Sequence, residues 1–228
     1  MRRKLSAIFL TGISAFALSG CIKLDMDMKV RADTKVDGTM IVAFSEEAMK
    51  SFEAMGASMG EGLNDKNSKT PTTKPKSFQQ QTEESVKETQ GKLPKGSKAK
   101  LYKKNGWIGQ EISFSGVDAG VALSAGTSAG STTGGTADTN KLSIVKKGDS
   151  LELNGVLDMG GDTGGADAGG LGDMSAMMGS TKPELKVKFT FPGKVTSASS
   201  GGKISGNSVT WTPVFGKKLI MKAVAKAK

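Results

Sequence analysis

The chain has 228 residues and a formal net charge of +10, with 36% hydrophobic residues and 31 glycines. This length and composition predict one domain with a folded core of roughly 150 residues and several polar loops. The sequence contains no histidine and one cysteine, which excludes Ser-His and Cys-His nucleophile pairs, histidine metal sites and internal disulfides. We therefore expect no enzymatic activity, no metal and no cofactor.

The N-terminus has the organisation of a signal peptide. A positive start, Met1–Lys4, precedes an uncharged and mostly apolar run from Leu5 to Leu18, which is shorter than the roughly 20 residues that span a bilayer. The segment Leu18-Ser19-Gly20-Cys21 then resembles the lipobox of bacterial lipoproteins. The resemblance implies cleavage after residue 20, and acylation of Cys21 by a diacylglycerol and usually a further chain such as palmitate. An ordinary secretory signal with a chance cysteine is the alternative, but it leaves the position of the only cysteine unexplained.

The mature chain, residues 21–228, carries a net charge near +7, because three of the positive charges lie in the leader. Its positive charge comes almost entirely from lysine, with Arg31 as its single arginine. This composition argues against base reading or phosphate clamping, so we expect no nucleic-acid partner. A basic domain beside a membrane suits anionic head groups or acidic glycopolymers. A solvated lysine surface without such a partner is an equal alternative.

The first part of the mature chain predicts a β-hairpin. Residues 22–32 alternate strictly between apolar and charged side chains, as a half-buried strand does. Asp37-Gly38 is a turn signal, after which Met40, Val42 and Phe44 return along the apolar face. Because this strand begins directly after Cys21, we expect the domain to sit close to the membrane.

A helix is predicted from about Ser45 to Leu63, with Ser45 as its N-cap. Four side chains recur along it at helical spacing and form a methionine-rich stripe: Met49, Phe52, Met55 and Met59. Such a stripe is either a soft ligand-binding face or a packed core, and the core interpretation is the more common one. Residues 64–77 predict a polar connector, and Gln79–Gln90 a short exposed helix.

Hairpins and glycine-rich stretches alternate in the middle of the chain. Asn105-Gly106 predicts a turn between strands at 99–103 and 107–114, and residues 147–150 predict another between strands at 142–145 and 151–157. Residues 119–140 and 158–182 predict flexible loops. The second loop holds several aspartates but lacks the spacing of calcium-binding repeats. Its end contains an apolar turn that covers a groove, enters lipid or forms a loose lid without a ligand, and the last alternative is as common as the other two: Met174, Met177 and Met178.

The last fifth of the chain predicts further strands. Leu185, Val187, Phe189 and Phe191 alternate with polar residues before a turn at Pro192-Gly193. Gly206-Asn207 predicts a hairpin between residue 204 and residues 209–211, and a final strand is expected at 219–225. The chain stops without a second apolar segment, so we expect the acylated Cys21 to be the sole membrane anchor.

These features together resemble the LppM-type lipoproteins of actinobacteria. The resemblance rests on the lipobox, the hairpin after Cys21, the stretch Phe189–Val195 and the hairpin Ile204–Trp211. It implies one compact α+β domain on the outer side of the cytoplasmic membrane. It also implies binding of envelope lipids or glycolipids rather than catalysis, and it supplies no catalytic residues.

The fold we expect is α+β, with a curved antiparallel sheet of about seven to nine strands packed on one main amphipathic helix. The concave space between them predicts a lipid or glycolipid site, lined by the stripe at 49–59, by Trp107 and by the methionines at 174–178. An adaptor lipoprotein that binds another envelope protein is the alternative. A hydrolase is the third hypothesis, and it would have to use carboxylates such as Asp25, Asp27, Glu111 or Asp118.

Overall fold

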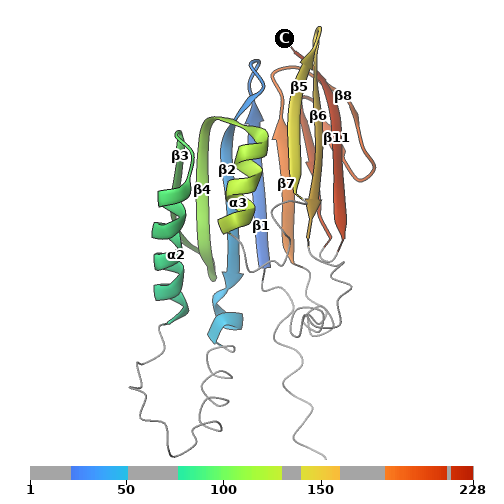
Figure 1. The fold of residues 1–228 in the computed structure, drawn as a ribbon. Helices are drawn as coiled ribbons and strands as arrows, with labels where there is room; N and C mark the ends of the chain where they lie inside the picture. Colours follow the sequence, from blue (N-terminus) through green and yellow to red (C-terminus); the bar gives the residue numbers. More distant parts are fainter. Residues whose placement is uncertain (1–21, 51–76, 130–139, 160–182, 215–216, 228) are drawn as a thin grey trace, which may run out of the picture.

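The structure, a computed structural model, describes residues 22–50, 77–129, 140–159, 183–214 and 217–227. These residues form two β-sheets together with helices α2 and α3 (Figure 1). The strands are β1 (Ile22–Val30), β2 (Lys35–Ser45), β3 (Ser97–Lys104), β4 (Trp107–Asp118), β5 (Lys141–Lys147), β6 (Ser150–Asp158), β7 (Glu184–Thr190), β8 (Val195–Ala198), β9 (Lys203–Ser205), β10 (Ser208–Trp211) and β11 (Lys218–Lys226). Helix α2 spans Phe78–Lys92, and α3 spans Ala119–Ala129.

The larger sheet has seven strands in the order β3-β4-β2-β1-β7-β10-β9, and the smaller has four in the order β5-β6-β11-β8. The α+β class is confirmed. The expectation of one antiparallel sheet is wrong in two respects, because the strands divide between two sheets and because β1 and β7 pair in parallel. Hairpin strands are antiparallel by necessity and carry turn signals in the sequence. The β1–β7 pair joins segments that are 161 positions apart, so no local signal announces it.

Several predicted hairpins are confirmed. Asn105 and Gly106 join β3 to β4 with φ of 53° and 75°, the left-handed conformation that a two-residue turn of this kind requires. Residues 148–149 join β5 to β6, and residues 206–207 join β9 to β10. The final strand is also present, as β11 against β6.

The turn predicted at Asp37-Gly38 is wrong, because both residues lie inside β2. The chain reverses earlier, where the amide of Arg31 donates to the carbonyl of Lys35 at 2.8 Å. Asp37 instead lies opposite two residues of β4, Ser115 and Gly116, which form a bulge in that strand where its register against β2 shifts. A Cβ at Gly38 would lie 2.1 Å from the carbonyl oxygen of Asp27, so the close approach of β1 requires glycine at this position.

The helices differ most from the sequence expectation. Residues 119–140 were expected to form a loop, but 119–129 form α3, whose Ala122 and Leu123 are each 1% exposed. Alanine is the strongest helix former, and burial of this apolar face outweighs the cost of two glycines. The helix expected at Gln79–Gln90 is confirmed and is slightly longer, as α2. Ser77 caps it with a capping box to Gln80.

Only the start of the predicted main helix lies within the described residues. Residues 46–50 are helical, and the amide of Ala48 donates to Oγ of Ser45 at 3.3 Å, as expected for an N-cap. The rest of this helix, and the glycine-rich loop at 160–182, lie outside the described residues. Of the described helices, α2 is the longest.

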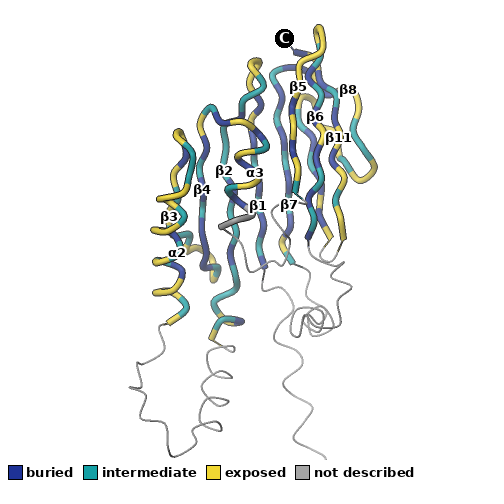
Figure 2. Tube along the Cα trace, viewed as in Figure 1, coloured by how far each residue is buried: buried dark blue, intermediate teal, exposed yellow. Residues whose placement is uncertain are grey.

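The hydrophobic core lies between the larger sheet and the elements on one of its faces, which are α2, α3 and the smaller sheet (Figures 1 and 2). Alternate residues of β1 point into this core and are buried from Ile22 to Val30, as the sequence alternation predicted. Phe189 and Trp211 are both fully buried, and their rings meet edge to face with centroids 6.4 Å apart. Such aromatic contact adds specificity to the burial of apolar area.

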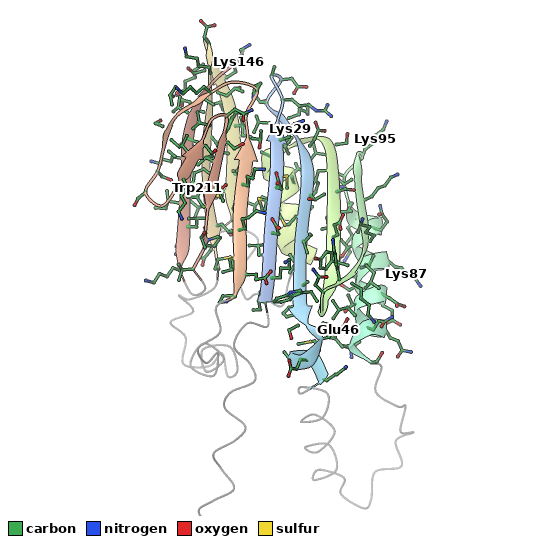
Figure 3. The ribbon with its side chains drawn as sticks, turned by 180° about the vertical axis from the view of Figure 1, so that it is seen from behind. Lys29, Glu46, Lys87, Lys95, Lys146 and Trp211 are labelled. Atoms are coloured by element: carbon green, nitrogen blue, oxygen red, sulfur yellow. The ribbon has the colours of Figure 1, made fainter. Side chains whose placement is uncertain are left out.

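The opposite face of the larger sheet is covered by no element that the structure describes (Figure 3). A row of ion pairs crosses from β1 to β7 on this face. Lys186 lies 3.0 Å from Asp25, Lys188 lies 3.2 Å from Asp27, and Lys23 pairs with Glu184. Because opposite charges stand at directly opposed positions, this row specifies the parallel register of the two strands.

In the described part of the chain, no helix is both long enough and apolar enough to cross a membrane.

Candidate functional site

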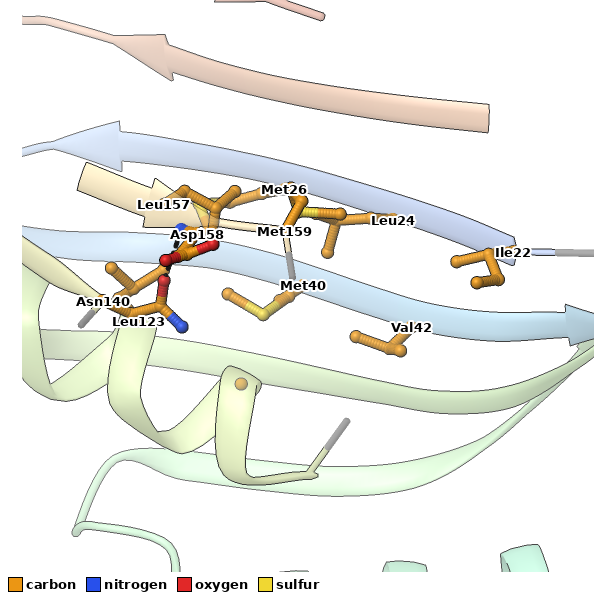
Figure 4. A pocket seen from close by; sticks show the side chains of 11 residues that line it. Ile22, Leu24, Met26, Met40, Val42, Leu123, Asn140, Leu157, Asp158 and Met159 are labelled. Carbon is orange, nitrogen blue, oxygen red and sulfur yellow. Dashed lines mark hydrogen bonds between the residues drawn. The ribbon is translucent and has the colours of Figure 1, made fainter. Parts of the chain in front are cut away.

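An apolar cleft lies between the larger sheet, α3 and the end of β6, at the end of the molecule where β1 begins (Figure 4). Most of its lining is aliphatic or methionine, and the strands contribute most of it. The lining residues are Ile22, Leu24 and Met26 of β1, Met40 and Val42 of β2, Leu123 and Gly126 of α3, Asn140, and Leu157, Asp158 and Met159.

The strand register brings the sheet side of the cleft together. Met26 pairs directly with Met40, and Leu24 with Val42, so these four side chains stand side by side on the core face of the β1–β2 hairpin. Met26 and Met40 are each 1% exposed. The sequence alternation therefore identified these residues correctly as inward-facing, but gave no sign that they border a cleft.

Helix α3 forms the second wall and approaches the sheet very closely. A Cβ at Gly126 would lie 1.8 Å from Sδ of Met40, so any larger residue there would displace either the helix or the methionine. Leu123, one turn earlier on α3, is 1% exposed. This wall was missed because the sequence around it was interpreted as a loop. Its alanines, which recur every three or four residues, and its single leucine are the signal that identifies it as a helix.

Polar groups lie at one side of the cleft. The amide of Asp158 donates to Oδ1 of Asn140 at 2.7 Å. This hydrogen bond joins the last residue of β6 to the residue before β5. Nζ of Lys218 lies 3.7 Å from the Asp158 carboxylate. An apolar space beside an amide, a carboxylate and a lysine suits an amphipathic molecule, with its chain inside and its polar end at this side.

The cleft is narrow in this conformation. Only about 30 Å³ of it is open to the centre of a water molecule, and the whole space, including the part open to solvent, is about 460 Å³. An acyl chain therefore enters only if the lining side chains move apart. Methionine suits this role, since its unbranched side chain changes conformation at low cost.

A second hollow lies on the smaller sheet, over β6, β8 and β11. Its volume is about 390 Å³, but it is shallow and open, and its lining includes Glu152, Asn154 and Lys222. It lacks the apolar walls of the cleft, and we do not assign it a ligand.

The predicted site residues fall into three groups. Trp107 lies on the opposite face of the larger sheet from the cleft, where Nζ of Lys23 is 5.5 Å from its ring centroid. Met49 is half-buried in the helical residues after β2 and is not part of the cleft lining. The remaining residues lie outside the described part of the chain: Cys21, Phe52, Met55, Met59, Met174, Met177 and Met178.

The carboxylates of the hydrolase hypothesis are separated and ion-paired rather than gathered in a cleft. Asp25 and Asp27 pair with lysines of β7, as described above. Glu111 lies 2.9 Å from Lys100, and Asp118 lies 3.3 Å from Lys35. All four occupy an open sheet surface, where such pairs act as cross-strand contacts. Across the described residues, no group of three or more acidic, cysteine or histidine side chains is arranged to hold a metal ion.

One electrostatic cluster ties the β1–β2 turn to β4. The Arg31 guanidinium binds the Asp37 carboxylate through two nitrogens, and the amide of Gly116 donates to Oδ1 of Asp37 at 3.0 Å. The hydrogen bond from Arg31, and then the one from the Gly116 amide, hold the pKa of Asp37 below its usual value. The cluster stabilises the end of the sheet that lies opposite the cleft. Its role is therefore structural.

Comparison with known proteins places this architecture in a family. The model of the LppM domain family matches residues 23–227, which include every element described above except the first residue of β1. Among solved structures, the NMR structure of the folded domain of LppM from Mycobacterium tuberculosis is similar, with a TM-score of 0.48 and 18% sequence identity over 99% of this chain and 95% of that one. The search of curated proteins found no match. Because the family model extends from β1 to the end of β11, the chain belongs to the LppM domain family.

Proposed function

We propose that the chain is a membrane-anchored lipoprotein of the cell envelope whose domain binds a lipid or glycolipid and catalyses no reaction. The observation that carries the proposal is the position of the apolar cleft. Ile22, the first residue of β1, lines the cleft, and it directly follows the cysteine of the lipobox. A ligand from the membrane would therefore meet the cleft at the end of the domain that faces the bilayer.

The proposed anchor is the acylated Cys21, which would hold the domain on the extracytoplasmic side of the cell membrane. Each buried CH2 group of an acyl chain contributes about 0.8 kcal/mol, so two or three chains hold a domain of this size firmly. The leader over residues 1–20 would be removed, and residues 21–228 would form a single mature domain. Membership of a lipoprotein family supports this reading.

The chemistry of the cleft supports an amphipathic ligand. Its walls are built from methionine, leucine and isoleucine, and its polar side carries Asn140 and Asp158, with Lys218 next to Asp158. Burial of an acyl chain against such walls gains about 25 cal/mol per Å² of apolar surface. This gain opposes the cost of moving Met26 and Met40 apart.

The alternative is an adaptor lipoprotein that binds another envelope protein. A specific observation favours it: the cleft is narrow, while one whole face of the larger sheet is covered by no described element (Figure 3). The two functions make different demands, since an adaptor needs no internal space, whereas a lipid-binding module needs the cleft to open.

Native mass spectrometry of the mature protein, after incubation with an envelope lipid extract, tests the proposal. Two variants of neighbouring residues sharpen it. Val42→Phe places a large ring in the cleft, and Ile41→Phe places the same ring on the opposite face of β2. We expect a discrete added mass on the wild type and on Ile41→Phe, removable by organic solvent, and a loss of most of it in Val42→Phe.

The contrary result would be a bare protein mass for folded wild type in the presence of the lipids. Equal lipid loading of the two variants would place any bound lipid outside the cleft. The anchor is tested separately by the mass of protein extracted from cell membranes, which should include acyl chains on Cys21 and should lack residues 1–20.

A further inference from the structure

The hairpin that joins β3 and β4 lies at the end of the larger sheet where β1 begins. The register shows this directly, since Ile22 pairs with Phe44, and Phe44 pairs with Ile108. Trp107 lies one residue nearer the end of the sheet than this row, and the turn Asn105-Gly106 lies beyond Trp107. Neighbouring strands are about 4.8 Å apart, so the start of β4 lies roughly 10 Å from the start of β1 across β2.

This hairpin tip, residues 103–107, is held in place by the neighbouring strands. The amide of Glu46 donates to the carbonyl of Gly106 at 2.8 Å, which attaches the turn to the end of β2. Nζ of Lys23 lies 5.5 Å from the centroid of the Trp107 ring, a cation–π contact with the second residue of β1. The tip is therefore a fixed projection of the sheet beside the site of the proposed anchor.

The composition of the hairpin tip matches a membrane surface. Trp107 is half-buried, and Lys103 and Lys104 are exposed. Tryptophan is enriched at the level of lipid head groups, and lysine is attracted to anionic lipids. Two acidic groups at this end have lysine partners, as Glu46 lies 3.9 Å from Lys103 and Glu184 pairs with Lys23. No carboxylate of the described residues pairs with Lys104.

We propose that the hairpin tip rests on the anionic membrane surface and so fixes the orientation of the domain beside its lipid anchor. This inference rests on the proposed attachment at Cys21. The residue before Ile22 is one Cα–Cα step, about 3.8 Å, from the first strand. The anchor therefore leaves the domain little freedom to move away from the membrane surface. The head-group region of each leaflet is about 5–8 Å deep, which accommodates the tip and leaves the sheet outside the bilayer.

The lysines give this contact a charge dependence. A lysine near an anionic surface strengthens its attraction by about 1 kcal/mol, which is about fivefold in affinity. The effect fades beyond the screening length of about 8–10 Å at physiological salt. The contact should therefore weaken in neutral vesicles and in high salt, while the tether itself is unaffected by either.

The test uses the fluorescence of Trp107, since the other tryptophan, Trp211, is fully buried in the core. The mature protein is coupled through the thiol of Cys21, its only cysteine, to a maleimide lipid in phosphatidylcholine–phosphatidylglycerol vesicles. Lipids brominated near the head group then quench any tryptophan at the interface. We expect strong quenching in the wild type and almost none in Trp107→Phe. Unquenched Trp107 in fully coupled protein would overturn the proposal.

A matched control addresses orientation, and a charge variant addresses the lysines. Lys146→Trp in the Trp107→Phe background places a tryptophan at the far end of the molecule (Figure 3), and we expect it to remain unquenched. Quenching there equal to that of Trp107 would show that the domain has no fixed orientation. Lys104→Glu should reduce the quenching of Trp107 in the mixed vesicles, and an unchanged signal would remove the electrostatic part of the proposal.

Chemical coupling keeps this test separate from the proposed function. The tether is supplied by the maleimide lipid, so the quenching result does not depend on whether the cell acylates Cys21. Absence of acyl chains on protein from cells would refute the native anchor, whereas absence of quenching in coupled protein would refute the hairpin contact alone.

Discussion

Ser199 shows how one hydroxyl joins the two sheets. Its Oγ accepts the indole N–H of Trp211 at 3.3 Å and the amide of Lys222 at 3.1 Å, and it donates to the carbonyl of Ile220 at 2.8 Å. Trp211 belongs to the larger sheet, whereas residues 220 and 222 belong to β11 of the smaller one.

Ser199→Ala should destabilise the protein by about 1–3 kcal/mol, because it leaves the fully buried indole N–H of Trp211 without its acceptor. The free energy of unfolding in urea measures this. Ser197→Ala on β8 is the control, since Ser197 is exposed and its loss should change stability by less than about 0.5 kcal/mol. Equal effects of the two variants would contradict the role of Ser199.

Asp37 predicts a specific dependence of stability on pH. Its pKa in the folded state lies below its usual value, because the Arg31 guanidinium and the Gly116 amide bind the charged carboxylate. The resulting stabilisation is present above the pKa of the unfolded chain, about 3.9, and is lost as pH falls through the lower folded value. Asp37→Asn should be less stable at neutral pH, by under about 1 kcal/mol for this partly exposed pair.

The difference between wild type and Asp37→Asn should shrink as the pH is lowered from 7 to below 4. Urea denaturation of both proteins across that range measures it. Stability curves that stay parallel at all pH values would show that the ion pair contributes nothing to the folded state.

At the scale of elements, the parallel β1–β7 pair is the least expected feature. The row of ion pairs between these two strands explains its register. Asp25→Lys or Lys186→Glu alone places like charges at opposed positions, and each should cost about 0.5–1 kcal/mol. The double variant restores opposite charges and should recover most of the loss. Additive losses in the double variant, measured by denaturation, would argue against pairing of these side chains.

The elements that the sequence predicted are those with a local signal. Alternation in residues 22–32 predicted β1, and Asn105-Gly106 predicted the β3–β4 hairpin, because both depend only on neighbouring residues. The parallel pairing of β1 with β7 depends on contacts between distant segments, so no local pattern contains it. Helix α3 was missed because its glycines resemble those of a loop, although its burial against the sheet decides its conformation.

Asp37-Gly38 illustrates a different limit. The dipeptide is a turn signal in the sequence, but in the structure it lies inside β2, opposite the bulge that Ser115 and Gly116 form in β4. Asp37 contacts Arg31 and the amide of Gly116 there, and the second of these contacts joins the dipeptide to a distant strand. A turn signal inside a long alternating segment therefore predicts irregularity more safely than it predicts reversal.

At the scale of the whole molecule, the two faces of the larger sheet have different roles. One face carries the core and the apolar cleft, and the other carries ion pairs and Trp107. Sequence alternation separated these faces, but the ligand site predicted from the sequence included Trp107, which lies on the ion-paired face beside Lys23. The methionines that border the cleft, Met26 and Met40, were identified only as core.

The methyl groups of the methionines offer the most direct test that a lipid enters the cleft. We propose to record NMR spectra of the mature protein with 13C-labelled methionine methyls while an envelope lipid or glycolipid fraction is added. Met26, Met40 and Met159 line the cleft, whereas Met221 is fully buried in the smaller sheet and is not part of the lining. We predict that the signals of the first three shift together and saturate while Met221 stays unchanged. Unchanged cleft methyls at lipid concentrations that load the protein, or a uniform shift that includes Met221, would contradict a lipid-binding cleft.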